Sequence, residues 1–255
     1  MRQILLGLIF ALICAPTVGR QIDVVVGWDK PPYVMADTHS GFELELVRQI
    51  LHEIGHEMYP IYVPFGRTTR LVNARSADIG LTINPRHNVD SKILSDVYVV
   101  YQNVAVTLAS RELKLHAIDD LEEHTIAAFQ TARLVLGEEF NALTAAHRGY
   151  LEMPEQQRQV SLLLLGSVDV AVMDRNIFMM LKNQLPAGRQ VEVDVHPLFG
   201  ISPYRAAIAD DELRKQFNRT LAQFIDDGRY QALIDEFNLV NLIDNLPTRT
   251  LTGSP

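Results

Sequence analysis

The stretch Val168-Asp169-Val170-Ala171-Val172-Met173-Asp174 decides the fold class of this chain. It is short, apolar and rich in β-branched residues, which is typical of a buried strand. Gly166 ends the helix that precedes it, and residues 175–181 have the pattern of a helix that follows it. A buried strand between two helices predicts an α/β fold with parallel strands.

The carboxylate that ends this strand is a candidate site residue. In open α/β sheets, ligands bind at the carboxyl ends of the strands. Asp174 therefore either caps the helix that follows or faces a ligand. A matching strand end, residues 77–82, occurs in the first half of the chain. Two polar strand ends in two halves predict a cleft between two lobes.

Composition limits the class of protein and of partner. The chain has 255 residues, of which 47% are hydrophobic, and a formal net charge of −8. This length and composition support one or two α/β domains with a large core. Basic residues form no block of the kind that binds a phosphate backbone, so we expect no nucleic-acid partner.

Residues 1–19 have the features of a secretory signal peptide. Arg2 supplies a positive charge, and residues 4–15 form an apolar segment that is short for a membrane span. The alternative is a single membrane anchor. The single cysteine, Cys14, lies in this segment, so the mature chain would have no disulfide, thiolate metal site or cysteine nucleophile. We expect the mature protein to be periplasmic.

The rest of the chain has the pattern of two sets of strands and helices. A β-rich stretch at residues 96–108 is long enough to run from one lobe into the other. We expect residues 204–209, which are again strand-like, to cross back. We expect a capping box at Ser40 and Glu43, and a single helix over residues 132–146. The other strands that we expect are residues 22–28, 58–63, 78–81, 125–129, 150–153 and 191–197.

This order of elements resembles the periplasmic solute-binding proteins of the polar amino-acid type, extracellular solute-binding protein family 3. The resemblance covers almost the whole mature chain. It is carried by an Asp-x-x-Pro-Tyr turn at 29–33, GFELEL at 41–46, Gly80-Leu81-Thr82 followed by Arg86, Ser95-Asp96-Val97-Tyr98, the stretch at 168–174, and Gly228-Arg229-Tyr230.

The resemblance implies a fold, a division into domains and a mechanism. The fold is the α/β, two-lobe periplasmic-binding-protein fold (type II), in which two crossover strands form a hinge that closes on a small solute. Residues 20–100 and 204–255 would form a discontinuous first lobe. Residues 101–203 would form the second lobe.

The resemblance also implies a ligand site in the cleft. In the family, an arginine after the Gly-x-Thr strand end binds a ligand carboxylate, an aspartate at the place of Asp174 binds the ligand ammonium, and aromatic residues hold the ligand side chain. Arg67, at the start of a helix near the cleft, is a further candidate. The full set of candidate ligand-binding residues is Asp29, Tyr33, Phe65, Arg67, Gly80, Thr82, Arg86, Thr131, Arg133 and Asp174.

Several of these residues have a structural alternative, and two parts of the pattern depart from the family. Arg67 and Arg86 would instead be solvated, and Tyr33 and Phe65 would pack in the core. Arg86 follows Thr82 by four residues, whereas the family's arginine follows by five. The family's second lobe has a Gly-Thr-rich turn whose N–H groups bind the carboxylate.

In this chain the corresponding turn, residues 129–133, contains no glycine. Thr131 and Arg133 are the candidates that would supply carboxylate donors in its place.

The sequence His52-Glu53-Ile54-Gly55-His56 matches the H-E-x-x-H motif of zinc peptidases. Gly55 predicts the end of the helix before His56, and the apolar stripe of that helix leaves His52 on the solvated side. We therefore interpret the match as coincidence and expect no metal and no cofactor.

We expect a monomeric, non-enzymatic protein that captures a small polar, amino-acid-like solute by hinge closure. The closed form would be presented to the inner-membrane permease of an ABC-type transporter or to a sensor protein. The alternative is a periplasmic enzyme on the same fold, similar to a dehydratase, in which a cleft carboxylate acts as a general acid–base. Asp174, Glu152 and Glu155 are the candidate acids for that alternative.

Overall fold

The computed structural model describes residues 19–28, 30–186, 188 and 191–246. Residues 1–18 of the proposed signal segment, among them Cys14, and Asp29 lie outside the described residues. Phe65 begins a helix, but its side chain is also outside what the structure describes.

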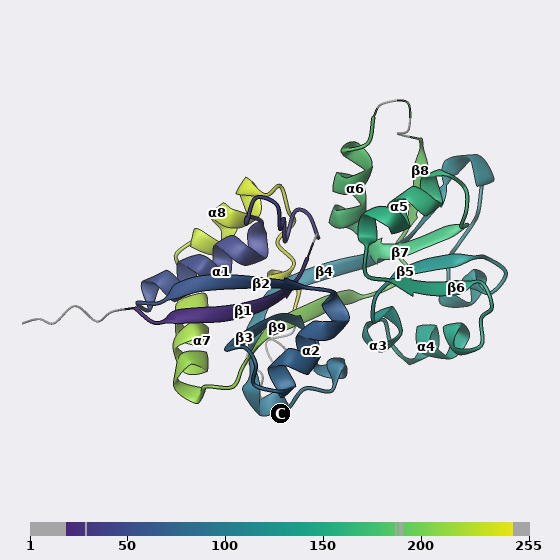
Figure 1. Cartoon of the computed structure of the whole chain (residues 1–255). Helices are drawn as coiled ribbons and strands as arrows, with labels where there is room; N and C mark the ends of the chain where they lie inside the picture. Colours follow the sequence, from purple (N-terminus) through teal and green to yellow (C-terminus); the bar gives the residue numbers. More distant parts are fainter. Residues whose placement is uncertain (1–18, 29, 187, 189–190, 247–255) are drawn as a thin grey trace, which may run out of the picture.

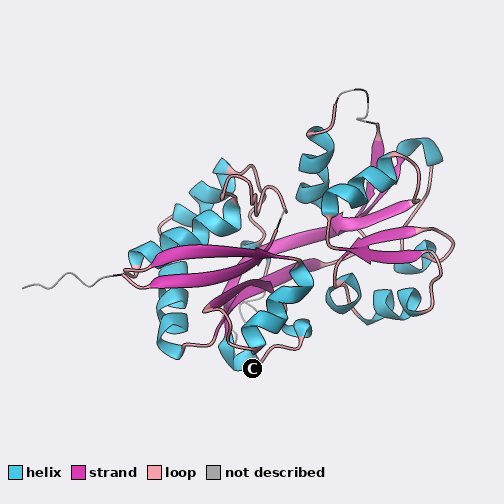
Figure 2. Ribbon diagram, viewed as in Figure 1, coloured by secondary structure: helices cyan, strands magenta, loops and turns pink. Residues whose placement is uncertain are grey.

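The described strands form a sheet with the order β2-β1-β3-β9-β4-β7-β5-β6, and β8 pairs with β4. Figure 2 shows a group of strands in each half of the molecule, joined by long strands that run from one half into the other, with helices packed on them. The strands are β1 (Gln21–Gly27), β2 (Glu57–Val63), β3 (Ile79–Ile83), β4 (Leu94–Leu108), β5 (Ile126–Phe129), β6 (Tyr150–Met153), β7 (Val170–Asp174), β8 (Val193–His196) and β9 (Ile201–Ile208).

The first lobe is built on β1, which pairs in parallel with β2 and β3. Three helices of this lobe pack against one another, and a fourth contacts β1 and β3. The three are α1 (Phe42–Glu53), α7 (Asp211–Asp226) and α8 (Arg229–Glu236), and the fourth is α2 (Phe65–Asn73).

The second lobe is built on β5, which pairs in parallel with β6 and β7. Every residue of β7 is buried, and this agrees with the apolar run that predicts a strand covered on both faces. The helices of this lobe are α3 (Ala132–Val135), α4 (Glu138–Ala145), α5 (Gln156–Leu164) and α6 (Arg175–Asn183).

Two long strands connect the lobes. β4 has 15 residues, which corresponds to about 50 Å of extended chain. Its first part pairs antiparallel with β9, and its second part pairs with β7 and β8. β4 therefore carries the chain from the first lobe to the second, and β9 carries it back (Figure 1).

Two local expectations are wrong. The predicted helix over residues 132–146 is two helices, α3 and α4, because Gly137 between them has a φ of 104°, which a glycine adopts without a steric penalty. The predicted capping box does not form either. The N-cap of α1 is Gly41, which has no side chain to offer, and Glu43 is fully buried and bonded elsewhere.

Within the part of the chain that the structure describes, no helix has both the length and the apolar character needed to cross a bilayer.

Candidate functional site

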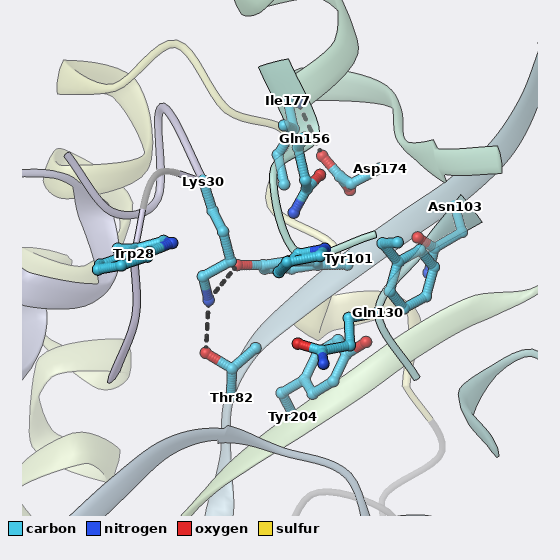
Figure 3. Close-up of a pocket in the computed structure, with 12 residues that line it drawn as sticks. Trp28, Lys30, Thr82, Tyr101, Asn103, Gln130, Gln156, Asp174, Ile177 and Tyr204 are labelled. Carbon is cyan, nitrogen blue, oxygen red and sulfur yellow. Dashed lines mark hydrogen bonds between the residues drawn. The ribbon is translucent and has the colours of Figure 1, made fainter. Parts of the chain in front are cut away.

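A cavity of about 30 Å³ lies between the two lobes. We call it the inner cavity. Its walls come from the carboxyl ends of β1, β3, β5 and β7 and from the crossover strands, the place where α/β sheets bind ligands. It is lined by Trp28, Lys30, Thr82, Tyr101, Asn103, Phe129, Gln130, Pro154, Gln156, Asp174, Ile177 and Tyr204 (Figure 3).

Lys30 occupies the first-lobe side of the inner cavity and is buried. Its ammonium donates to Oε1 of Glu43 at 3.0 Å, to Oγ1 of Thr82 at 2.7 Å and to the hydroxyl of Tyr101 at 3.3 Å. Figure 3 shows Lys30 extended toward Thr82 beside Tyr101. These bonds give each ammonium hydrogen an acceptor, and they fix Thr82 and Tyr101 at the cavity wall.

Glu43 offsets the cost of burying the Lys30 ammonium, because an isolated charge in the core is strongly unfavourable. Its carboxylate also accepts hydrogen bonds from the hydroxyls of Tyr98 and Tyr101, and from Thr82 at 2.7 Å. Burial acts to raise the pKa of Glu43, but the charge of Lys30 and the hydroxyl donors outweigh it and lower that pKa. Burial lowers the pKa of Lys30, against the charge of Glu43. The pair is therefore compensated within the first lobe.

Asp174 lies on the second-lobe side, where it caps a helix and also lines the inner cavity. It is the N-cap of α6, because Oδ1 accepts the N–H groups of Asn176 at 2.9 Å and Ile177 at 3.1 Å. Oδ2 accepts the N–H of Gln102 at 3.0 Å. The same side chain lines the inner cavity. Burial raises the pKa of Asp174 to about 6, against the lowering effect of these N–H donors.

Aromatic and amide side chains form most of the remaining wall. Tyr101 packs edge-on against Tyr204, with ring centroids 5.0 Å apart, and stacks on Tyr33 at 4.1 Å. Trp28 stands at the mouth and is 41% exposed. Such a wall suits the apolar body of a solute, and the amides of Asn103 and Gln130 offer both donors and acceptors to its polar groups.

Hydrogen bonds connect the two lobes across the cleft, so the structure is in a closed form. They join Gly66 N–H to Gln130 Oε1 (2.8 Å), Asn176 Nδ2 to the Tyr33 hydroxyl (3.0 Å), Arg86 Nη1 to the Val135 carbonyl (2.7 Å), and His87 Nε2 to Thr131 Oγ1 (3.3 Å).

The tautomer of His87 follows from its partners. Nδ1 accepts the backbone N–H of Asn84 at 3.0 Å, so the ring hydrogen is on Nε2, which faces Thr131 across the cleft. Burial lowers the pKa of His87 to about 4. The neutral ring therefore caps the short 3₁₀ helix Pro85–His87 and contributes to the cross-lobe contacts at neutral pH.

The turn after β5 is bound by a carboxylate of the chain itself. Thr131 has a φ of 76°, which turns neighbouring N–H groups toward one side. The N–H groups of Thr131 and Arg133 donate to the two oxygens of Glu152, at 2.8 and 3.0 Å. The hydroxyl of Tyr150 donates to Glu152 at 2.7 Å. The guanidinium of Arg133 reaches the carbonyl of Thr144 at 2.5 Å.

The structure brings some of the expected site residues to the inner cavity and places others elsewhere. Thr82 and Asp174 line it, and Tyr33 supports it from behind Tyr101. Gly80 lies in β3, where a Cβ atom would be 2.2 Å from Cγ2 of Val72, so the residue permits close packing.

The remaining expected residues lie outside the cavity lining. Arg67 is exposed on α2, and the guanidinium of Arg86 bonds to Val135. Thr131 and Arg133 form the turn that Glu152 binds.

The residues that the sequence reasoning missed are Lys30, Glu43, Tyr101 and the amides of the lining. Glu43 carried a signal, because it lies four residues before Val47 and seven before Ile50, on the apolar face of α1. An acid on a buried helix face needs a partner. Lys30 carried no comparable signal.

The H-E-x-x-H match has no helical basis, because α1 ends at Glu53 and His56 lies beyond it. Among the described residues, no group of three His, Cys, Asp or Glu side chains is placed to hold a metal ion.

Comparisons with known proteins bear on the family and the fold of the chain. The model of the bacterial extracellular solute-binding proteins, family 3, matches residues 22–239. In sequence, the chain matches none of the curated proteins with which it was compared.

Solved structures of low sequence identity share the two-lobe fold. A histidine kinase sensor domain similar to periplasmic binding proteins has 18% identity and a TM-score of 0.73, with 86% of this chain and 96% of that chain covered. An ancestral arginine-binding protein bound to arginine has 18% identity and a TM-score of 0.72, with 85% and 97% covered. An amino acid ABC transporter substrate-binding protein from Streptococcus pneumoniae, bound to L-arginine, has 17% identity and a TM-score of 0.68, with 85% and 94% covered.

Proposed function

This chain belongs to family 3 of the bacterial extracellular solute-binding proteins, and we propose that it captures one small polar solute between its lobes without catalysing a reaction. The observation that carries this proposal is the inner cavity, whose walls come from the strand ends of both lobes. Thr82 of the first lobe and Asp174 of the second are the proposed contacts that the sequence and the cavity lining share.

Capture works through the hinge. Opening at β4 and β9 breaks the cross-lobe hydrogen bonds and admits the solute, and closure restores them around it. A solute that contacts both lobes binds the closed form more tightly, and this difference in affinity drives closure. In the closed form the inner cavity, of about 30 Å³, has room for about two water molecules, so a larger group enters it only when the lobes separate.

We further propose that the protein is a periplasmic monomer, secreted through residues 1–19, and that closure is read by a membrane partner. Members of this family are typically periplasmic or extracellular. One similar structure is an ABC transporter substrate-binding protein, which supports a transporter permease as that partner. Another is the sensor domain of a histidine kinase, which supports a role of this fold in sensing.

A periplasmic enzyme with a cleft acid is a second candidate, favoured by the raised pKa of Asp174, at about 6. A general acid–base at this pKa could transfer protons near neutral pH. Mass spectrometry of the bound solute, before and after incubation, separates the two candidates. An unchanged solute supports capture, and a product supports catalysis.

Fluorescence of Trp28 tests the proposed function directly. Trp28 is the single tryptophan of the chain and stands at the mouth of the inner cavity. The protein is first unfolded and refolded to remove any bound molecule, and then titrated with amino acids, amines, small carboxylates and sugars. We expect a saturable change with one class of compound, lost in Asp174→Ala and kept in the control Asp235→Ala, an exposed acid of α8. Absence of any saturable change, with no shift in melting temperature, contradicts the proposal.

A further inference from the structure

A second and much larger hollow adjoins the inner cavity. It has a volume of about 850 Å³, and we call it the outer groove. The two hollows share Trp28, Pro154 and Gln156 in their walls, so one continues into the other. The outer groove lies between the loop 31–38 of the first lobe and the helices α5 and α6 of the second.

The two sizes indicate the shape of the solute. The inner cavity, at about 30 Å³, accepts one small end group, whereas the outer groove, at about 850 Å³, accepts a chain of many atoms. A solute that fills both is therefore elongated. Its end lies beside Asp174, and its body passes Trp28 and Pro154.

The charges along this path favour a cation at each end. In the inner cavity Lys30 is paired with Glu43, whereas Asp174 accepts backbone N–H groups and forms no ion pair among the described residues. In the outer groove two exposed acids, Asp37 and Glu155, face one base, Arg158. Asp37 belongs to the first lobe and Glu155 to the second.

Several of the donors that would receive a carboxylate are bonded within the chain itself. One of the five guanidinium N–H groups of Arg86, on Nη1, donates to the carbonyl of Val135. The N–H groups of Thr131 and Arg133, the natural anion site at the end of β5, are bound to Glu152. A solute carboxylate that used these two N–H groups would have to displace Glu152.

We propose that the solute is a linear amine that carries two cationic groups and no carboxylate. One cationic end enters the inner cavity beside Asp174. The other lies in the outer groove near Asp37 and Glu155, and the methylene chain crosses the aromatic wall at Trp28. Because Asp37 and Glu155 come from different lobes, the outer cation also holds the lobes together. This inference rests on the proposed function and specifies its solute.

Matched pairs of compounds that differ by a single carboxylate test the inference. They are putrescine and ornithine, cadaverine and lysine, and agmatine and arginine, each titrated into the refolded, ligand-free protein while the emission of Trp28 is followed. We expect at least one amine to bind tenfold or more tightly than its amino acid. An amino acid that binds as tightly as its amine, or more tightly, overturns the inference and leaves solute capture intact.

A variant tests the outer end of the site. The double substitution Asp37→Asn and Glu155→Gln should weaken the diamine three- to tenfold and leave butylamine, which has a single cation, within twofold. The control replaces two exposed acids elsewhere, Asp119→Asn and Glu139→Gln, and should change neither. Equal weakening of the diamine and of butylamine contradicts the outer cation site. If no amine, amino acid or other solute binds at all, the proposed function itself fails.

Discussion

Replacing Lys30 by methionine removes the cation that compensates Glu43. Methionine is similar in length to the lysine stem, so the substitution deletes the charge with little change in packing. Glu43 would then be a fully buried carboxylate held by hydroxyl groups alone. Removing one partner of a buried ion pair costs about 3–5 kcal/mol. For a chain of this size that corresponds to a fall of about 6–20 °C in melting temperature.

A double-mutant cycle separates the charge from the packing. Lys30→Met and Glu43→Gln are each compared with the combined variant by urea unfolding at neutral pH. Glutamine at position 43 is neutral, so the combined variant contains no unpaired charge. We expect it to be less destabilised than the sum of the two single variants, with a coupling of about 2 kcal/mol or more.

The pH dependence of stability provides a second test of the Lys30–Glu43 pair. In the wild type the pKa of Glu43 is lowered, so its contribution to stability is present above its ordinary pKa and is lost as the pH falls. In Lys30→Met, burial without the cation raises that pKa. The destabilisation relative to wild type should therefore shrink as the pH is lowered from neutral toward 5. A constant difference across this range, or additive single effects, would refute the reasoning.

Three further predictions concern His87, Gly80 and Glu152. The pKa of His87 is lowered to about 4 in the folded protein. As the pH falls, His87 therefore takes up a proton in the unfolded state at a higher pH than in the folded state. Between pH 6.5 and 4, the free energy of unfolding of the wild type should fall by about 3 kcal/mol more than that of a His87→Asn variant, as measured by urea unfolding. Equal pH profiles of the two proteins would contradict this. Gly80→Ala places a methyl group against Val72 and should lower the free energy of unfolding by about 1–3 kcal/mol. When it is combined with Val72→Ala, the loss of stability should be smaller than the sum of the two single losses. An additive result would show that the two residues do not meet. Glu152→Ala leaves two N–H groups of the turn without their acceptor and should lower the stability measured by thermal melting by about 1–3 kcal/mol. The control Glu139→Ala, at an exposed position, should change stability by less than about 0.5 kcal/mol. An equally small effect at both positions would argue against the Glu152 contact.

The fold was predictable because its decisive elements are local patterns. The run at 168–174 is a buried strand between helices, and the long apolar stretch before residue 108 spans the two lobes as β4. Each of these depends on the spacing of apolar residues within a single segment. Gly137, which divides the predicted helix, shows the limit of this reasoning, because a glycine within a helical pattern either is tolerated or ends the helix.

The site was only partly predictable because its bonds join residues far apart in the chain. Lys30 is 52 residues from Thr82 and 71 from Tyr101. Tyr98 and Tyr101, three residues apart, would lie on opposite faces of a regular strand. The pairing of β4 with β9 shifts register between Val97 and Val99. Such a bulge re-aims side chains, and both hydroxyls reach Glu43.

Glu43 illustrates how one residue type supports two interpretations. The sequence around it fits a capping box, in which an acid in the first turn bonds the backbone. The same position also lies on the buried face of α1. Tertiary burial decides between the two, because Lys30 and two tyrosine hydroxyls offer stronger partners than a single N–H.

Small-angle X-ray scattering of the refolded, ligand-free protein, alone and with the compound that changes Trp28 emission, tests the capture of a solute between two lobes most directly. If the lobes close around the solute, the radius of gyration falls on its addition, and Asp174→Ala abolishes the change. Scattering curves that stay identical at a saturating concentration of that compound would contradict capture by hinge closure.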